Sequence, residues 1–301
     1  MTTGSSPNSQ AETAVKAVEK LSSPFRDTIM RLLRKPGPVI GLIVLAAIIL
    51  STVFAPQVAP YDPNKINPLS AFKPPGPGNL MGADHFGRDI LSRIIYGGRL
   101  SLTVGIISTG IAALAGITLG ILSGFLGGWV DALIGRFLDV LLAFPGLLLT
   151  LGVAVTLGAG LQNLMIAVGI GSIPGFARLV RGTVLSAKEN TYVQAATALG
   201  CPDFIIMLKH ILPNVMAPII VYSTLTIAGA ILTGASLSYL GMGAQPPTAE
   251  WGLMLSDGRD HLRRAWWICA FPGVAIMLTV IAINMVGDGL RDVLDPRLRS
   301  R

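Results

Sequence analysis

Charged residues are scarce in this chain of 301 residues: they make up 13%, against roughly 25% in a soluble domain. A surface that faces water cannot be built from so few charges, so lipid must cover much of the protein. Hydrophobic residues make up 51%, and glycine, at 35 residues, is plentiful, as where membrane helices pack closely. The net charge of +7 does not indicate a nucleic-acid partner, because the basic residues are dispersed and flank apolar runs.

Cysteine and histidine are also rare, and neither forms a recognisable site. Cys201 and Cys269 match no metal or redox spacing, so we expect two free thiols. His85, His210 and His261 fall in separate regions, whereas a metal site needs several converging ligands. The sequence therefore predicts no metal centre and no bound cofactor in this chain.

Two further absences bear on what could drive such a membrane protein. The chain has no phosphate-binding loop of the form G-x-x-x-x-G-K-[ST], so it does not hydrolyse ATP itself. The centres of its apolar runs carry no Asp, Glu, Lys or Arg, which an ion-coupled carrier usually needs. A secondary carrier and a membrane-embedded enzyme are therefore weaker alternatives to a conduit that a separate ATPase moves.

The apolar runs predict an all-α protein with six transmembrane helices, since each crossing takes about 20 apolar residues. The first run follows a hydrophilic leader and starts later than a signal peptide would, so we expect an uncleaved anchor. The residues from Gly158 to Asn163 divide one long run into two spans. The expected spans lie within Val39–Ala55, Leu100–Val130, Val140–Ala177 (spans three and four), Ile211–Tyr239 and Ala265–Met285.

These spans divide the chain into four parts. We expect a leader (1–37), a first helix with an outside loop (38–99), a core of five helices (100–290) containing a long loop (182–213), and a tail (291–301). Fifteen of the 23 lysines and arginines fall on the side of the two termini and the long loop. The positive-inside rule then places that side in the cytoplasm of a multi-pass protein of the inner or plasma membrane.

Four glycines recur at intervals of four along the second expected span: Gly116, Gly120, Gly124 and Gly128. This spacing places them on one helix face, where they let another backbone approach closely. We expect helix packing there, with a pore-lining face as the alternative.

The 182–213 loop predicts two short helices. The first runs from Tyr192 to Leu199 and ends at Gly200, which suits a left-handed C′ position. The second runs from Asp203, as an N-cap, to Leu212. Such a knob between two spans, with the small Ala195 and Ala196 on its first helix, could seat in a groove of another protein.

This loop resembles the EAA loop of binding-protein-dependent ABC importer permeases. The resemblance rests on Gln194-Ala-Ala196, Gly200 four residues on, and Leu212-Pro213. In that family the loop is a coupling helix that sits in a cleft of the ATPase subunit. The resemblance therefore implies coupling to an ATPase by Tyr192, Gln194, Ala195, Ala196, Gly200, Leu212 and Pro213. Two positions depart from the family pattern: Gln194 replaces a glutamate and His210 an isoleucine.

Other segments resemble the C-type permease of dipeptide and oligopeptide importers. They include Leu80–Arg93, Gly127–Asp131, Ala143–Pro145, Ala177–Gly182, Ser236–Gly241, Gln245–Pro247, Trp251-Gly252 and Gly287–Pro296. Gly234 departs from the glutamate that this family often has. The resemblance implies a type I importer permease fold, a B-type permease as second subunit, two ATPase subunits that bind ATP and Mg²⁺, and an extracytoplasmic peptide-binding protein.

The resemblance implies dipeptides or short oligopeptides as the substrate. Glutathione is the alternative, because Ser172–Pro174 and Phe176–Arg178 resemble the glutathione branch, and a nickel chelate is a further one. Two outside segments, Met81–Arg93 and Gly241–Arg264, are candidates for contact with the binding protein. Within them we select Asp84, Arg88, Asp89, Gln245 and Trp251.

Overall fold

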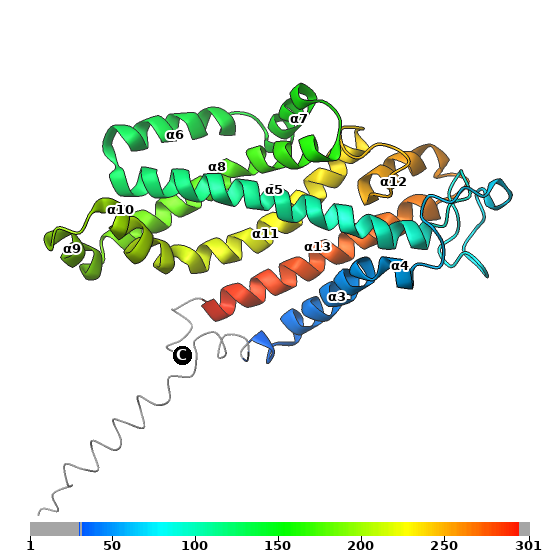
Figure 1. Ribbon diagram of the computed structural model, residues 1–301, viewed down its shortest axis with the longest axis horizontal. Helices are drawn as coiled ribbons and strands as arrows, with labels where there is room; N and C mark the ends of the chain where they lie inside the picture. The colour runs from blue at the N-terminus through cyan, green and yellow to red at the C-terminus, as the bar shows by residue number, and fades with distance from the viewer. Residues whose placement is uncertain (1–29, 31, 295–301) are drawn as a thin grey trace, which may run out of the picture.

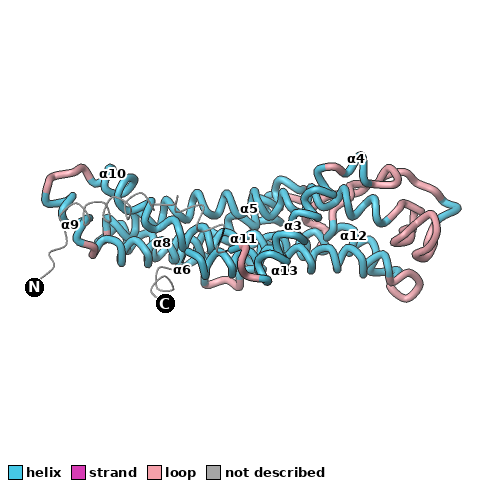
Figure 2. The backbone as a smooth tube through the Cα atoms, turned by 90° about the horizontal axis from the view of Figure 1, so that it is seen from below, coloured by secondary structure: helices cyan, strands magenta, loops and turns pink. Residues whose placement is uncertain are grey.

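The computed structural model describes residues 30 and 32–294, which form an elongated bundle of helices (Figures 1 and 2). Helix α9 lies at one end of the bundle, and α12 lies at the other with the loop of residues 59–89. We call these the α9 end and the α12 end. Most of the expected leader, and the tail from residue 295, lie outside the described residues.

The bundle is built from helices of very unequal length. They are α3 (Pro36–Val53), α4 (Ala55–Val58), α5 (Ile90–Leu126), α6 (Gly128–Leu142), α7 (Gly146–Leu157), α8 (Leu161–Lys188), α9 (Thr191–Ala198), α10 (Asp203–Ile205), α11 (Leu212–Tyr239), α12 (Trp251–Gly258) and α13 (Trp267–Leu294). Short turns complete them: η1 (Pro68–Ser70), the π-helical η2 (Ile206–Ile211) and η3 (Arg259–His261). The loop of residues 59–89 adds two isolated β-bridges.

Five described helices are long and apolar enough to cross a membrane, and α6 with α7 provides a sixth crossing if that bent pair is one span. An all-helical membrane fold is therefore confirmed. The third crossing does not begin at Val140, because Val140 lies inside α6, which meets α7 at 90°. Pro145 lies at this bend; it disfavours a helical conformation at Phe144.

Helix α5 is longer than the sequence indicated. It starts at Ile90, where the Asp89 carboxylate caps it by accepting from the Ser92 amide at 2.8 Å. Its 37 residues extend over about 55 Å, well beyond the roughly 30 Å of bilayer hydrocarbon. The expected boundary between residues 99 and 100 therefore falls inside one continuous helix.

The glycine face of α5 packs against α8. A Cβ atom added to Gly120 would lie 2.6 Å from Cβ of Val180, and one added to Gly124 would lie 2.9 Å from Cβ of Val184. Gly116 meets Phe176 in the same way. At these distances only glycine fits; any larger residue would require one of the two helices to move away.

The prediction that Gly128 continues this face is wrong. Helix α5 ends at Leu126, and Gly127 and Gly128 both have positive φ angles, of 66° and 53°, in the turn into α6. A Cβ atom added at Gly128 meets nothing within 4 Å. The glycine face of α5 thus ends at Gly124, and Gly128 serves the turn instead.

Helix α3 packs along α13 on the opposite side of the bundle. Gly41 allows this approach, because an added Cβ atom would lie 2.8 Å from the Ala282 carbonyl oxygen. At the α9 end of this pair, the Lys35 ammonium group lies 2.6 Å from the Asp292 carboxylate.

Candidate functional site

The loop at the α9 end is held by a regular helix termination. Gly200 has φ +75°, and its amide donates to the Thr197 carbonyl at 3.0 Å. The Cys201 amide reaches back to the Ala196 carbonyl at 3.1 Å. These two bonds form a Schellman motif, which glycine adopts without steric cost. Gly200 therefore has the left-handed conformation that was expected for the residue after this helix.

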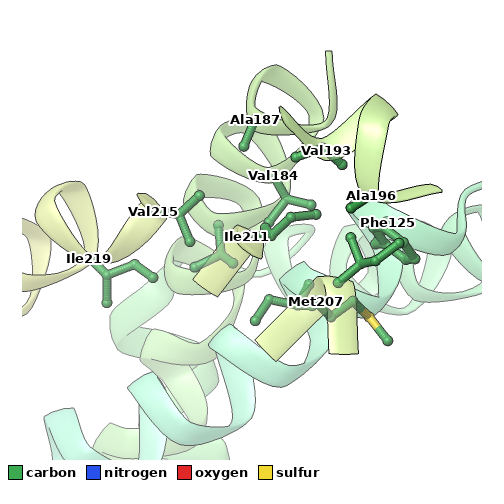
Figure 3. Close-up of a cluster of buried hydrophobic side chains, with 12 residues drawn as sticks. Phe125, Val184, Ala187, Val193, Ala196, Met207, Ile211, Val215 and Ile219 are labelled. Carbon is green, nitrogen blue, oxygen red and sulfur yellow. The ribbon is translucent and has the colours of Figure 1, made fainter. Parts of the chain in front are cut away.

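One side of α9 is buried in an apolar cluster (Figure 3). Val193 and Ala196, one helical turn apart, point into it and are 2% and 7% exposed. The cluster joins them to α5, α8, η2 and α11 through Phe125, Val184, Ala187, Ile206, Met207, Ile211, Val215 and Ile219. The short helix thus sits rigidly on the ends of three long helices.

The opposite side of the loop is exposed and carries large apolar side chains. Tyr192, Gln194 and Ala195 are exposed, as a docking helix requires. Ala196 differs from the expectation, because it belongs to the buried cluster and cannot contact another protein directly. Two residues that the sequence reading missed are far more exposed: Leu199 at 84% and Phe204 at 66%.

The second expected helix of this loop is not separate. Asp203 is the first residue of α10 and not its N-cap, and its side chain makes no cap hydrogen bond. From there the chain runs through η2 into α11, so that residues 203–239 form one apolar helical unit. Leu212 is half-buried and Pro213 is exposed, at the start of α11, where proline is tolerated. His210 lies in the π-helical turn and accepts from the Asn214 amide group through its carbonyl oxygen at 2.6 Å.

A cavity of about 600 Å³ lies between α9 and the end of α5. Phe125, Lys188 and Gln194 contribute to its lining. The Lys188 ammonium group donates to the Phe125 carbonyl at 2.7 Å and so ties α8 to α5. The Gln194 side chain donates to the Glu189 carbonyl at 3.2 Å, so this residue stabilises its own loop without needing the charge of a glutamate.

Ion pairs fasten α6 to α8, the helix that leads into α9. The Arg181 guanidinium donates to both oxygens of the Asp131 carboxylate at 2.6 Å, a bidentate geometry. Ser123 of α5 donates to the same carboxylate. Nearer the bend in the α6–α7 pair, Arg178 donates to Asp139 at 2.7 Å. Helices α5, α6 and α8 are therefore linked by polar contacts as well as by packing.

The α12 end contains a buried ionic cluster. Arg88 donates to the Asp84 carboxylate at 2.6 Å and lies 3.6 Å from that of Asp257. Arg93 donates to the carbonyl oxygens of Pro63 and Pro247, at 3.1 and 3.3 Å. These bonds pin the 59–89 loop and the segment before α12 onto the start of α5.

This burial overturns most of the predicted contact with a binding protein. As whole residues, Asp84, Arg88, Asp89 and Trp251 are each at most 4% exposed, so they cannot meet a partner directly. They hold the α12 end together: Asp89 caps α5, and the Trp251 indole donates to the Ile94 carbonyl at 2.9 Å. Of the five selected residues, Gln245 alone is exposed. Asp84 and Arg88 pair with each other inside the protein.

Gly234, where the resembling family often has glutamate, lies at the contact of α11 with α5. A Cβ atom added there would lie 2.6 Å from Cγ1 of Val104. A glutamate side chain therefore has no room without a shift of these helices.

Histidine and cysteine make no metal centre in the described part of the chain. His85 and His261 do meet, however, with ring centroids 5.1 Å apart. Burial lowers the pKa of His85 below its usual 6.5; the nearby Asp84 carboxylate opposes this shift, and Arg88 reinforces it. Cys201 and Cys269 are free and half-buried.

Comparisons with known proteins agree with the fold. The family described as "binding-protein-dependent transport system inner membrane component" matches residues 116–300. The family described as "N-terminal TM domain of oligopeptide transport permease C" matches residues 23–75. A chain of the MetNI methionine ABC transporter, in an inward-facing conformation, shares the fold with a TM-score of 0.57 at 17% identity. That likeness covers 68% of this chain and 98% of the other.

Curated relatives match along nearly the whole length. The dipeptide transport system permease protein DppC of Alkalihalophilus pseudofirmus is 45% identical over 92% of this chain and 91% of its own. The di/tripeptide transport system permease protein DppC of Pseudomonas aeruginosa is 43% identical, over 92% and 94%. The glutathione transport system permease protein GsiD of Pectobacterium atrosepticum is 42% identical, over 94% of both. The chain belongs to the family of inner membrane components of binding-protein-dependent transport systems.

Proposed function

We propose that this chain is one of two permease subunits of an ATP-driven importer, and that an ATPase subunit docks on the α9 loop. The observation that carries the proposal is the exposed apolar surface of Leu199 and Phe204 on a rigid, buried base. Large apolar side chains that protrude from the end of a membrane bundle mark a protein interface. The coupling role given to Tyr192, Gln194 and Ala195 rests on the same surface.

The way the α9 loop is attached supports a mechanical role. Val193 and Ala196 bind it to a cluster that includes residues of α5, α8 and α11. A push on α9 would therefore move three long helices together, because packed apolar clusters transmit displacement and do not absorb it. Closure of ATPase subunits, with ATP and Mg²⁺ bound by them, would supply that push. Opening and closing of a path between this chain and a second permease would follow.

The arrangement of the two ends supports the expected orientation. If an ATPase meets α9, then the α9 end and both termini face the cytoplasm, in agreement with the distribution of basic residues. The α12 end then faces an extracytoplasmic binding protein. Because Asp84, Arg88 and Trp251 are buried, we assign that contact to exposed side chains such as Gln245 and Leu69, which is 99% exposed.

We infer that the substrate is a dipeptide or short oligopeptide. Relatives named for dipeptide and di/tripeptide transport are 43–45% identical to this chain over nine-tenths of its length. A glutathione system is the second candidate, since a relative named for glutathione transport is 42% identical over a similar length. Glutathione is itself a small peptide with a free carboxylate, so one path could accept both chemistries.

Reconstitution of the complete complex in liposomes tests this function. We expect ATP-dependent uptake of dipeptides, with ATP hydrolysis stimulated by the peptide-loaded binding protein. Glutathione and a nickel chelate, tested in parallel through the same binding protein, would identify the alternatives. Uptake that persists without ATPase subunits and follows an ion gradient would contradict the proposal.

A further inference from the structure

A groove of about 640 Å³ opens between α3, α5, α11 and α13, remote from the α9 loop. Its walls are mostly aliphatic. Six of the side chains that line it are Leu45, Ile49, Leu102, Ile106, Ile227 and Ile283. The three threonine hydroxyls beside them are already bonded inside the protein: Thr52 donates to the Ile49 carbonyl, Thr103 to the Arg99 carbonyl and Thr224 to the Val221 carbonyl. The groove therefore offers an apolar ligand no unpaired threonine donor.

One cation lies at the end of this groove nearest the α12 end. The Arg99 guanidinium donates from Nε to the Thr52 carbonyl at 2.5 Å and from a terminal nitrogen to the Val53 carbonyl at 2.7 Å. These are neutral acceptors, and no carboxylate among residues 32–294 lies within 4.0 Å of the group. Of the five guanidinium N–H donors, about three remain for a ligand. Arg99 is exposed, so a ligand can reach them.

The length of the groove matches one leaflet of a bilayer. Along α3 the lining extends from Val53 to Leu45, eight residues or about 12 Å. Half of a typical hydrocarbon core is about 15 Å. Arg99, a residue of α5, contacts the last residues of α3. Its guanidinium therefore lies where a lipid headgroup would lie, and the aliphatic wall lies where an acyl chain would lie.

We propose that this groove binds a membrane phospholipid, with its phosphate on Arg99 and one acyl chain against Ile49 and Ile106. Charge complementarity favours this occupant over an apolar helix of a partner protein, which would leave the guanidinium uncompensated. The phosphate is the anionic group recognised, and the aliphatic wall requires that it be attached to an acyl chain. The bound lipid would fill the space between α3 and α5 and fix the angle of the first membrane helix.

Photolabelling of the complete complex in nanodiscs tests the site. The probe is a phosphatidylglycerol with a photoreactive group on its acyl chain, and mass spectrometry of peptides from α3 and α5 is the readout. Arg99→Gln should lower the labelling about fivefold, as expected for the loss of one basic contact with an anionic headgroup. Arg99→Lys should retain most of it. Arg263→Gln, an exposed arginine at the α12 end outside the groove, is the matched control.

A second variant tests the apolar groove independently of Arg99. Ile106 is 59% exposed, so Ile106→Trp fills the groove without disturbing the bonds of Arg99, and it should also reduce labelling. Glycerol phosphate, which lacks an acyl chain, should not compete with the probe. Equal labelling in Arg99→Gln, Ile106→Trp and the unmodified complex would overturn the proposal. So would a disulfide, formed with an added oxidant, between Ile49→Cys and a cysteine placed in a membrane helix of the second permease, because a protein would then occupy the groove.

Discussion

The Lys188 ammonium group donates a hydrogen bond to the Phe125 carbonyl at 2.7 Å, across 63 residues of sequence. It also lies 5.3 Å from the centre of the Phe125 ring. The bond joins the last residue of α8 to the end of α5, directly beside the helix on which we propose the ATPase docks. Movement of α9 can therefore reach α5 without passing through the whole of α8.

Replacement of this lysine should weaken coupling while the fold survives. Lys188→Met keeps the aliphatic stem but removes the donor, and for an exposed group we expect a loss of about 1 kcal/mol or less in stability. Peptide-stimulated ATP hydrolysis by the reconstituted complex should fall several-fold. Basal hydrolysis serves as the internal control, and an unchanged stimulation ratio would show that the bond carries no coupling.

Gly200 should tolerate few substitutions, because its φ of +75° is unfavourable for side chains with a Cβ atom. Gly200→Val should cost about 1–3 kcal/mol locally and abolish ATP-driven uptake, whereas Gly200→Asn should retain part of it. The matched control is Gly182→Val, at an exposed glycine of α8 with open space around it. Wild-type uptake in Gly200→Val, measured with the ATPase still bound, is the outcome that would refute this role.

The glycine face of α5 gives a prediction about assembly of the bundle. Gly120→Leu would force α5 and α8 apart, at a cost of about 1–3 kcal/mol or more. The midpoint of thermal unfolding in detergent should fall. Gly110→Leu on the same helix should have little effect, since an added Cβ atom there meets nothing within 4 Å. Equal midpoints for the two variants would mean that the contact between α5 and α8 is not tight.

The half-buried His85 should make the 59–89 loop sensitive to acid. Its pKa is lowered in the folded state, so below about pH 6.5 the unfolded state binds a proton that the folded state does not. The free energy of unfolding therefore decreases as the pH falls from the pKa of His85 in the unfolded state to its lower pKa in the folded state. The protection factors of amides in residues 60–89, which correct for the slower intrinsic exchange in acid, should fall between pH 7 and pH 5. His85→Asn should flatten that slope, and an undiminished slope would assign the effect to another group.

The membrane helices could be predicted because long apolar runs report directly on burial in lipid. The early start of α5 at Ile90 could not, since Ser92 and Arg93 are polar and become buried only through contacts with distant loops. The bend before α7 had a local signal in Pro145, but its angle depends on how α6 packs on α8. Contacts between distant segments therefore determine the start of α5 and the angle of the bend, which hydrophobic periodicity alone does not predict.

In the α9 loop, too, some features could be predicted from the sequence and others could not. Gly200 was readable from sequence, because a left-handed turn after a helix needs glycine. Ala196 appeared suited to a partner, yet its spacing of three from Val193 places both in the buried cluster. Leu199 follows the last helical residue, and the turn at Gly200 leaves its side chain outside the cluster. Which apolar residues were exposed thus depended on where the helix ended.

Docking of the ATPase on Leu199 and Phe204 is the central claim, and one measurement tests it most directly. The double variant Leu199→Asp/Phe204→Asp should insert in the membrane and pair with the second permease. Co-purification of the ATPase subunits should fall at least about tenfold, because each buried apolar side chain is worth about 1.5–3 kcal/mol. Leu69→Asp, at a still more exposed leucine of the α12 end, is the control and should leave that ATPase yield unchanged. Wild-type amounts of bound ATPase in the double variant would contradict the account.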